Sequence, residues 1–159
     1  MKDYDEILVA LRQITRAIDL YSKRLQRDTG LTTSQLLVLQ AIDRLDKPTP
    51  GAVAREIVLS QATVTNLLDR LQKSDYVERL KIGTDKRTVN LVLTDQGQSI
   101  LASAPELLQT EFLNRYRSLE NWEQQMLAAS LGRIATMMNA EDIDASPILT
   151  PGEVNPGTT

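Results

Sequence analysis

The sequence predicts a mainly α-helical fold with one small β-hairpin, and three observations lead to this prediction. Apolar residues recur every three or four positions over most of the chain, which is typical of amphipathic helices. Between Val77 and Leu93 the period falls to two on either side of the polar turn GTDKR, which is typical of a hairpin. The chain has 159 residues, 42% of them apolar and 25% charged, which suits one globular domain.

The first helix is expected over about residues 4–28. Its apolar positions are spaced alternately four and three apart, a heptad period that requires a partner helix. Because this helix is long and terminal, we expect the seam to pack against a second copy of the chain; the alternative is an ordinary amphipathic helix on its own core. The predicted dimerisation residues are Ile7, Leu11, Ile14, Ile18, Tyr21 and Leu25.

Three shorter helices are expected next, each with a recognisable start. A capping box formed by Thr32 and Gln35 begins a helix that ends near Asp46. Thr49, followed by a proline, begins one that runs through residue 57, and Ser60 caps one that ends near residue 74. In this last helix an apolar stripe faces the core, whereas the opposite face is small and polar.

The hairpin is expected to consist of strands over residues 77–82 and 88–93. Helical periodicity returns over residues 95–139, where Pro105 predicts a kink or an early restart and a final helix begins near Glu120.

The expected organisation is a single domain over residues 1–139 followed by a tail. Within the domain, residues 32–94 lie between the dimerisation helices. The tail, residues 140–159, contains four acids and no base, and its Pro, Gly and Thr content predicts an extended or disordered segment. Three apolar residues could hold the tail in a groove as an extended strap: Ile148, Leu149 and Val154.

The sequence contains neither cysteine nor histidine. Their absence excludes disulfides, thiol redox sensing, Cys/His zinc sites and nucleophilic pairs that depend on histidine. No phosphate-binding loop or calcium-binding loop is recognisable, so we expect no catalysis, no metal and no cofactor. No apolar run approaches the roughly 18 residues of a membrane span, and acids occupy the N-terminus where a signal peptide requires bases, so we expect a cytoplasmic protein without a membrane partner.

Charge is distributed unevenly along the chain. The net charge is −3, yet residues 60–94 hold six bases and four acids, so this segment carries +2 and the rest carries −5. An acidic average therefore does not argue against a nucleic-acid partner for the segment.

Two short helices in series, followed directly by a hairpin, form the order of a winged helix-turn-helix. The second helix would enter a major groove about 12 Å wide, which requires small side chains and short hydrogen-bonding groups on its outer face. The fold class is therefore a mainly α winged helix-turn-helix domain with N- and C-terminal dimerisation helices. The predicted DNA contacts on the helix are Ser60, Gln61, Ala62, Thr63, Thr65, Asn66, Arg70 and Lys73, of which the last two suit phosphates.

The segment LLDRLQKSDYVERLKIGTDKRTVNLVLTDQG resembles the MarR family of bacterial winged-helix regulators. It is similar to the family pattern in which L-x-x-L-x-x-x-G-[LY]-[VI]-x-R is followed by D-x-R and then by L-T-x-x-G. The resemblance covers about residues 5–140. Ser74 and Asp75 stand where the family commonly has a glycine, a difference that alters the C-cap of a helix.

The resemblance implies a homodimer that binds double-stranded DNA at a pseudo-palindromic operator and represses nearby genes until a ligand is bound. The two recognition helices would then lie roughly 34–36 Å apart, one turn of DNA. In the wing, the resemblance implies that Arg87 enters the minor groove beside the recognised major groove, and that Asp85 braces the wing by pairing with a nearby base such as Arg79. Lys86 and Arg87 are both predicted DNA contacts, which put positive charge at the tip of the wing. The alternative for TDKR is a solvated hairpin turn.

The resemblance also implies an effector site between the dimerisation helices and the winged domain, suited to a small anionic or aromatic compound. Arg12 and Arg16 lie off the heptad seam and are the candidates, with ordinary solvated arginines as the alternative. An alternative function for the whole chain is a winged-helix adaptor that binds proteins and not DNA. A salt titration would distinguish the two functions. Contacts to DNA phosphates make binding affinity fall steeply as the salt concentration rises.

Overall fold

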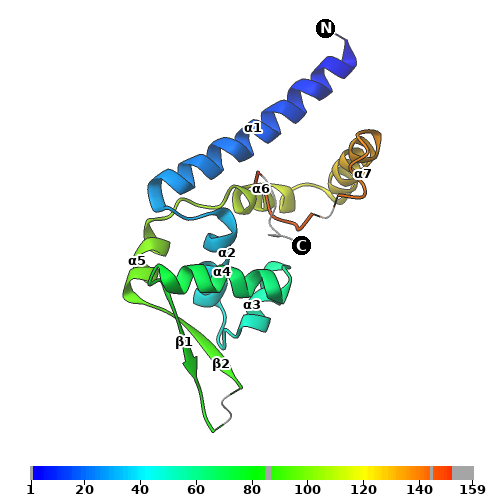
Figure 1. The fold of residues 1–159 in the computed structure, drawn as a ribbon. Helices are drawn as coiled ribbons and strands as arrows, with labels where there is room; N and C mark the ends of the chain where they lie inside the picture. The colour runs from blue at the N-terminus through cyan, green and yellow to red at the C-terminus, as the bar shows by residue number, and fades with distance from the viewer. Residues whose placement is uncertain (1, 85–86, 144, 152–159) are drawn as a thin grey trace. The chain divides into compact units, whose positions relative to one another are not determined.

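The computed structural model describes residues 2–84, 87–143 and 145–151, and within them the chain is mainly helical with one two-stranded antiparallel sheet (Figure 1). None of the helices in these residues is both long enough and apolar enough to cross a membrane. The elements are α1 (Asp3–Thr29), α2 (Thr33–Arg44), α3 (Pro50–Ile57), α4 (Gln61–Lys73), β1 (Val77–Lys81), β2 (Val89–Leu93), α5 (Asp95–Ser103), α6 (Leu108–Arg117) and α7 (Asn121–Met137).

The described residues form two compact units. One contains α1 to α5, both strands and residues 146–151, and the other contains α6 and α7 within residues 106–145. The division falls where the sequence left open a kink or a restart. Ala104, the residue before Pro105, is extended with ψ 141° and ends α5, because the proline ring disfavours helical backbone in the preceding residue.

The helix starts predicted from the sequence are confirmed in the first unit. The Thr32 hydroxyl accepts from the Gln35 backbone N–H at 3.2 Å, and the Gln35 side chain accepts from the Thr32 N–H at 2.9 Å. The Thr49 hydroxyl likewise accepts from the Ala52 N–H at 3.1 Å, just before the proline at the first position of α3. These bonds satisfy donors that a helix start otherwise leaves unpaired.

The core of the first unit is built around α2, α3, α4 and the base of the hairpin. Its fully buried side chains include Leu36 and Leu39 of α2, Val53 of α3, Leu68 of α4 and Leu91 of β2. The apolar stripe predicted on α4 therefore faces the core, and the opposite face of this helix is left at the surface.

The heptad seam of α1 divides into two parts. Ile7 and Ile14, in the N-terminal two thirds, are 46% and 48% exposed, whereas Leu25 has no exposed surface. Predicting Leu25 as a dimerisation residue was therefore wrong, because its side chain is already buried within its own chain. Leu11 and Ile18 are partly buried. A heptad period indicates that one face of a helix packs against another element. It does not indicate whether that element belongs to the same chain or to a second copy.

The hairpin pairs residues Val77–Lys81 with Val89–Leu93 in antiparallel register, so that Arg79 lies opposite Leu91. We call these two strands and their turn the wing. The Leu91 N–H points away from β1 and donates to the Pro48 carbonyl at 2.7 Å, which ties the wing to the loop after α2.

The base of the wing is closed onto the start of α5. Thr94 caps α5 by accepting from the Gly97 N–H at 2.9 Å, and the same hydroxyl donates to the Asp75 carbonyl at 2.6 Å. Asp75 has φ +63°, in the left-handed region that favours glycine. A Cβ on Gly97 would lie 2.0 Å from the Tyr76 carbonyl oxygen, so only glycine allows this contact between α5 and the wing.

Candidate nucleic-acid interface

The turn between α3 and α4 sets the direction of the candidate recognition helix α4. The α3 helix ends at Val58, whose φ of 57° and ψ of 47° are left-handed, and α4 starts after the Ser60 cap. The Ser60 hydroxyl accepts from the Thr63 N–H at 3.1 Å and lies 2.7 Å from the Thr63 hydroxyl. The Ser60 side chain therefore caps α4. Ser60 is also exposed, at the N-terminal end of α4, where helix N–H groups lack partners within the helix.

Val58 is a strained position that the sequence did not reveal. A β-branched residue in the left-handed region costs about 1–2 kcal/mol, and the Val58 side chain is 60% exposed, so burial offsets little of this cost. We expect Val58→Asn to raise Tm by about 2–5 °C, since asparagine tolerates this backbone. Thermal unfolding followed by circular dichroism measures the change. Val58→Ile, which keeps the branch, should show no gain, and a lower Tm for Val58→Asn would contradict the explanation.

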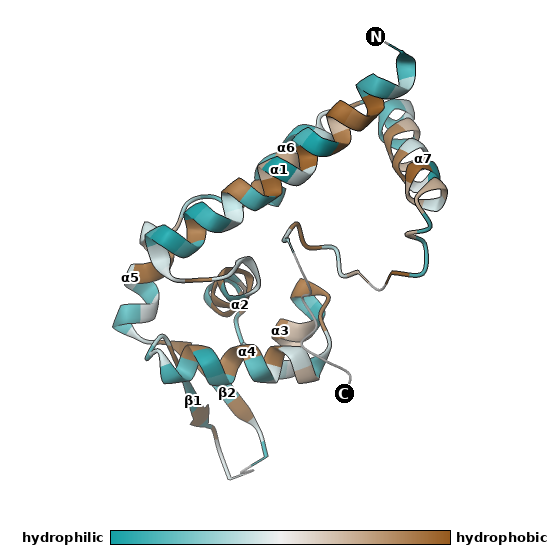
Figure 2. Cartoon of the chain, turned by 45° about the horizontal axis from the view of Figure 1, so that its top comes forward, coloured by the Kyte–Doolittle hydropathy of each residue, from teal (hydrophilic) through white to brown (hydrophobic). Residues whose placement is uncertain are grey.

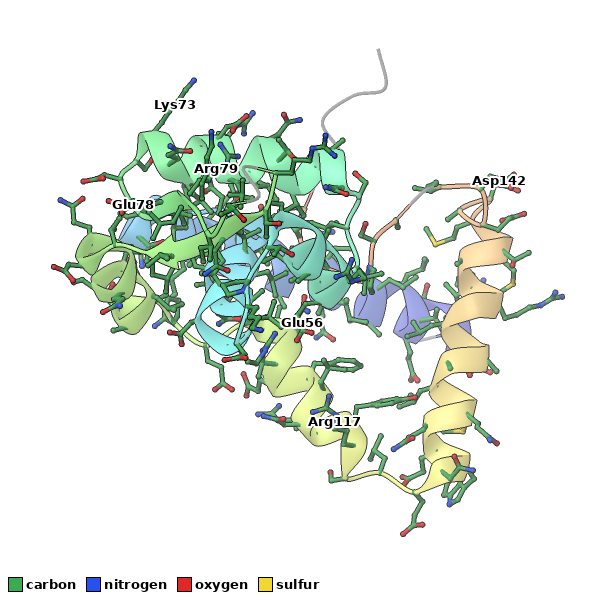
Figure 3. All side chains as sticks on the ribbon, turned by 90° about the horizontal axis from the view of Figure 1, so that it is seen from below. Glu56, Lys73, Glu78, Arg79, Arg117 and Asp142 are labelled. Carbon is green, nitrogen blue, oxygen red and sulfur yellow. The ribbon has the colours of Figure 1, made fainter. Side chains whose placement is uncertain are left out.

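The outer face of α4 contains most of the predicted DNA contacts on this helix. Besides the exposed Ser60 cap, six of them are exposed: Gln61, Ala62, Thr65, Asn66, Arg70 and Lys73. Lys73 extends away from the helix (Figure 3). Arg70 and Lys73 lie in the last turn, so the polar residues with short side chains precede the two long cations. This order suits base edges at the N-terminal half and phosphates at the C-terminal half.

Thr63 is the exception, and its prediction as a DNA contact was wrong. The residue is only 3% exposed and lies on the buried side of α4 beside Val64. Its hydroxyl is engaged at the helix start with Ser60. Its polarity suggested an outer position, but this polar residue belongs to the cap and not to the outer face.

Thr65 is exposed but has a fixed hydroxyl. Its Oγ1 donates to the Gln61 carbonyl at 2.8 Å, a bond to the residue four positions earlier in the helix. The hydroxyl proton is therefore not available for a base, and the side chain offers a methyl group and an acceptor. Such a group fits a thymine methyl or an amino group at a base edge.

Arg79 of β1 is paired with the recognition helix. Its Nη2 lies 2.7 Å from Asp69 Oδ1, and its Nη1 donates to Gln72 Oε1 at 2.9 Å. The Arg79 side chain is 28% exposed and lies next to α4 (Figure 3). The sequence suggested Asp85 as its partner; Asp85 and Lys86 lie outside the described residues, whereas the pairing with α4 was not foreseen. Arg87 is exposed near the tip of the wing.

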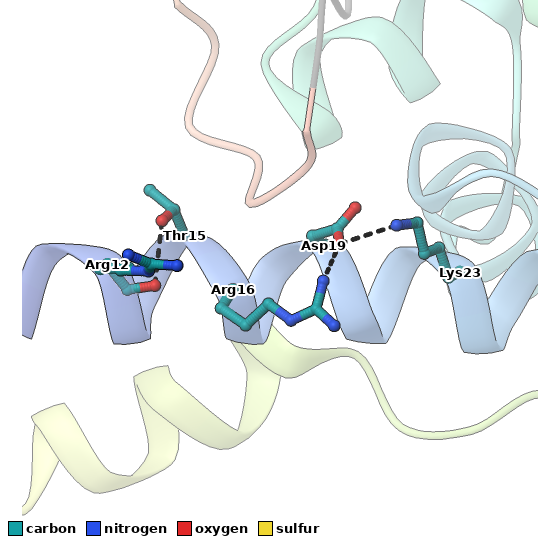
Figure 4. A network of polar contacts seen from close by, with 5 residues as sticks. All are labelled: Arg12, Thr15, Arg16, Asp19 and Lys23. Carbon is teal, nitrogen blue, oxygen red and sulfur yellow. Dashed lines mark hydrogen bonds and ion pairs between the residues drawn. The ribbon is translucent and has the colours of Figure 1, made fainter.

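The two effector candidates lie on the exposed middle part of α1 (Figure 4). Arg16 Nη1 and Lys23 Nζ each lie 3.0 Å from Asp19 Oδ2, so Arg16 is part of a surface ion network. The Arg12 backbone carbonyl accepts from the Thr15 hydroxyl at 3.1 Å. The geometry brings these two arginines to no common site with the winged residues.

Tyr21 is the predicted dimerisation residue with the most unusual environment. Burial raises the pKa of its phenol above the ordinary 10.0, and the charge of Arg24 opposes this effect. Within the part of the chain that the structure describes, the Tyr21 hydroxyl has no hydrogen-bond partner. A buried hydroxyl is normally paired, so a group from outside the described residues would complete this position.

Residues 29–88, which include α2 to α4 and the first strand of the wing, match a model described as MarR family. Over this segment the chain is similar to the MarR family. The relatives described next are HTH-type transcriptional regulators, so the similarity is to transcriptional regulators and not to enzymes.

Two relatives illustrate how far the similarity to other proteins extends. The uncharacterized HTH-type transcriptional regulator YsmB of Bacillus subtilis is 27% identical over 129 residues, which cover 81% of this chain and 88% of YsmB. The HTH-type transcriptional regulator SarZ of Staphylococcus aureus is 33% identical over 81 residues, which cover 51% of the chain and 55% of SarZ. The match to YsmB thus extends well beyond the winged segment.

Solved MarR-type structures share the fold. A MepR-like protein complexed with pseudoligands has a TM-score of 0.58 at 22% identity, over 87% of this chain and 97% of that one. FabT of Streptococcus pneumoniae, in complex with DNA, has a TM-score of 0.53 at 22% identity, over 86% and 98% of the two chains. The mainly helical architecture with a two-stranded wing, as expected for the MarR family, is therefore confirmed.

Proposed function

We propose that this chain is a MarR-family transcriptional regulator that binds double-stranded DNA in a sequence-specific way, with α4 in the major groove and the wing at the adjacent minor groove, and that it does so in the cytoplasm. The observation that carries the proposal is the outer face of α4, where short polar side chains are followed by Arg70 and Lys73. FabT, a protein of the same fold, has been solved in complex with DNA, which supports DNA binding by this chain.

The exposed residues of α4 suggest which bases are read. The amide side chains of Gln61 and Asn66 match the donor and acceptor pair of adenine, and Ala62 and Thr65 offer methyl groups to thymine. Bidentate guanine contacts are made by arginine or lysine, and the first two turns of α4 hold neither. We therefore expect A·T pairs at the centre of each half-site.

A homodimer is the assembly that the exposed apolar surface supports. Along α7, whose described residues include none that is buried, Trp122 is 63% exposed and Leu131 is 50% exposed. Apolar residues also recur along α1, where Ile7 is exposed (brown in Figure 2). A helix with this much apolar surface requires a partner, and a second copy would also provide a group for the Tyr21 hydroxyl.

Selection of bound duplexes from a random pool tests DNA binding and symmetry together. We expect an inverted repeat with A·T-rich half-sites whose centres lie about 10 base pairs or a multiple apart, because two α4 helices related by a two-fold axis meet successive major grooves. Affinity should fall steeply with salt, as phosphate contacts require. Failure to enrich any duplex at low salt would contradict the proposal and favour the adaptor function.

The regulatory consequence we propose is repression that a small anionic or aromatic compound relieves. Arg16 is engaged with Asp19, which leaves Arg12 as the better placed of the two candidate arginines for an anion. Release of the selected duplex by an aromatic carboxylate such as benzoate, measured by fluorescence anisotropy, would support this consequence. Release that persists unchanged in Arg12→Ala would remove Arg12 from the site.

A further inference from the structure

The wing and the recognition helix are joined by one guanidinium group. Arg79 lies midway along β1, and its two terminal nitrogens contact Asp69 at 2.7 Å and Gln72 at 2.9 Å. These two partners are three residues apart on α4 and therefore share one face of the helix. Because the planar guanidinium group contacts two acceptors at once, it fixes the orientation of Arg79 relative to α4 as well as its distance from the helix.

The position of this contact along the hairpin allows it to influence the direction of the outer wing. At the base, Val77 and Leu93 are buried, so packing holds that end of the wing. Beyond Arg79, Leu80 is 45% exposed and Ile82 is 54% exposed, so core packing does not hold the outer part. The direction in which the outer wing extends from α4 thus depends on contacts near Arg79.

The contact also changes the charge of the DNA-facing side. Asp69 is 50% exposed in its side chain and lies on the same helix as Arg70 and Lys73. An unpaired carboxylate there would repel phosphates. Arg79 neutralises it, while the ion pair itself contributes little to stability because both groups are partly exposed to solvent.

We propose that Arg79 is a positioning residue for DNA binding, which sets the angle between the wing and α4 so that Arg87 reaches the minor groove when α4 occupies the major groove. This inference rests on the proposed function. A positioning role and a neutralising role make different predictions, because only positioning makes the contribution of Arg87 depend on Arg79.

A double-mutant cycle measures that dependence. Arg79→Met keeps the apolar stem and removes the fork, and Arg87→Ala is made in both backgrounds; affinity for the selected duplex is measured by fluorescence anisotropy at fixed salt. We expect Arg87→Ala to weaken binding by roughly 5- to 150-fold in wild type and by about 2-fold or less in Arg79→Met. Arg79→Lys, which retains the charge without the fork, should fall between them.

The matched control is Arg44→Met. Arg44 of α2 pairs with Glu56 of α3 at 2.8 Å, so the substitution also removes one positive charge and one exposed ion pair but leaves the contacts of Arg79 with Asp69 and Gln72 in place. Here the cost of Arg87→Ala should be the same as in wild type. Thermal unfolding of each variant establishes that the affinities compare folded proteins.

Asp69→Asn separates the two roles of Arg79. If Arg79 only neutralises Asp69, this variant binds at least as tightly as wild type and the cost of Arg87→Ala is unchanged. If Arg79 positions the wing, the cost of Arg87→Ala falls, as in Arg79→Met. Additive effects in both cycles would overturn the positioning role while leaving DNA binding intact, whereas a wild-type protein that binds no duplex would overturn the proposed function itself.

Discussion

Gly97→Ala is expected to destabilise the winged unit by about 3 kcal/mol or more, and to lower Tm by about 10 °C or more. The added Cβ would lie 2.0 Å from the Tyr76 carbonyl oxygen and 3.0 Å from its carbon. Both are backbone atoms at the start of the wing, so relief requires α5 to move away and stretches the bonds that Thr94 makes to both sides. Thermal and urea unfolding measure the loss.

Gly51→Ala is the matched control in the same unit. A Cβ at Gly51 would meet only the Arg55 side chain, at an ordinary 3.5 Å. Because alanine favours helix over glycine by about 1 kcal/mol, this variant should be as stable as wild type or slightly more so. Equal stability of the Gly97 and Gly51 variants would show that α5 and the wing do not make the close contact described above.

Arg87→Ala is expected to weaken binding to the selected duplex by roughly 5- to 150-fold, the range that corresponds to about 1–3 kcal/mol for a specific arginine contact. Arg87 is exposed near the tip of the wing, and a narrow A·T-rich minor groove attracts arginine through its negative potential. Fluorescence anisotropy at physiological salt gives the affinity, with unfolding curves to show that the variant folds as wild type does.

The specificity of this effect can be checked with two further variants. Arg87→Lys keeps the charge and should recover part of the affinity, because lysine lacks the planar fork. Arg44→Ala removes an exposed charge that pairs with Glu56 of α3 and not with the wing, and it should cost little. An Arg87→Ala protein that binds as tightly as wild type would mean that the turn GTDKR is a solvated loop.

Local signals in the sequence predicted the elements well. Capping residues such as Thr32 and Ser60 mark helix starts because the bonds they make span only three residues. The change of period at Val77 likewise marks the wing, because alternation depends on neighbouring residues alone. The polarity of a residue and its place in the heptad period were less informative about whether its side chain is buried. Thr63 and Leu25 each fit the pattern of an exposed contact, but tertiary packing covers both side chains.

The parts of the candidate site that were missed depend on residues distant in sequence. The sequence does not indicate that Arg79 contacts α4. This contact depends on the angle between the wing and the helix, which no local pattern specifies. The need for glycine at position 97 arises from a carbonyl 21 positions earlier, at Tyr76. The left-handed Val58 contradicts residue preference and could only be found in the backbone itself.

The bond from the Leu91 N–H to the Pro48 carbonyl has a consequence for solubility. A short two-stranded sheet exposes two edges, and unpaired edges invite strands from other molecules to add on and aggregate. The carbonyl of Pro48 occupies the donor at the middle of the β2 edge, and proline has no N–H with which to continue a ladder. The other strand carries Glu78, Arg79 and Lys81, charges that discourage a further strand. The wing can therefore remain exposed for a partner without becoming a nucleus for self-association.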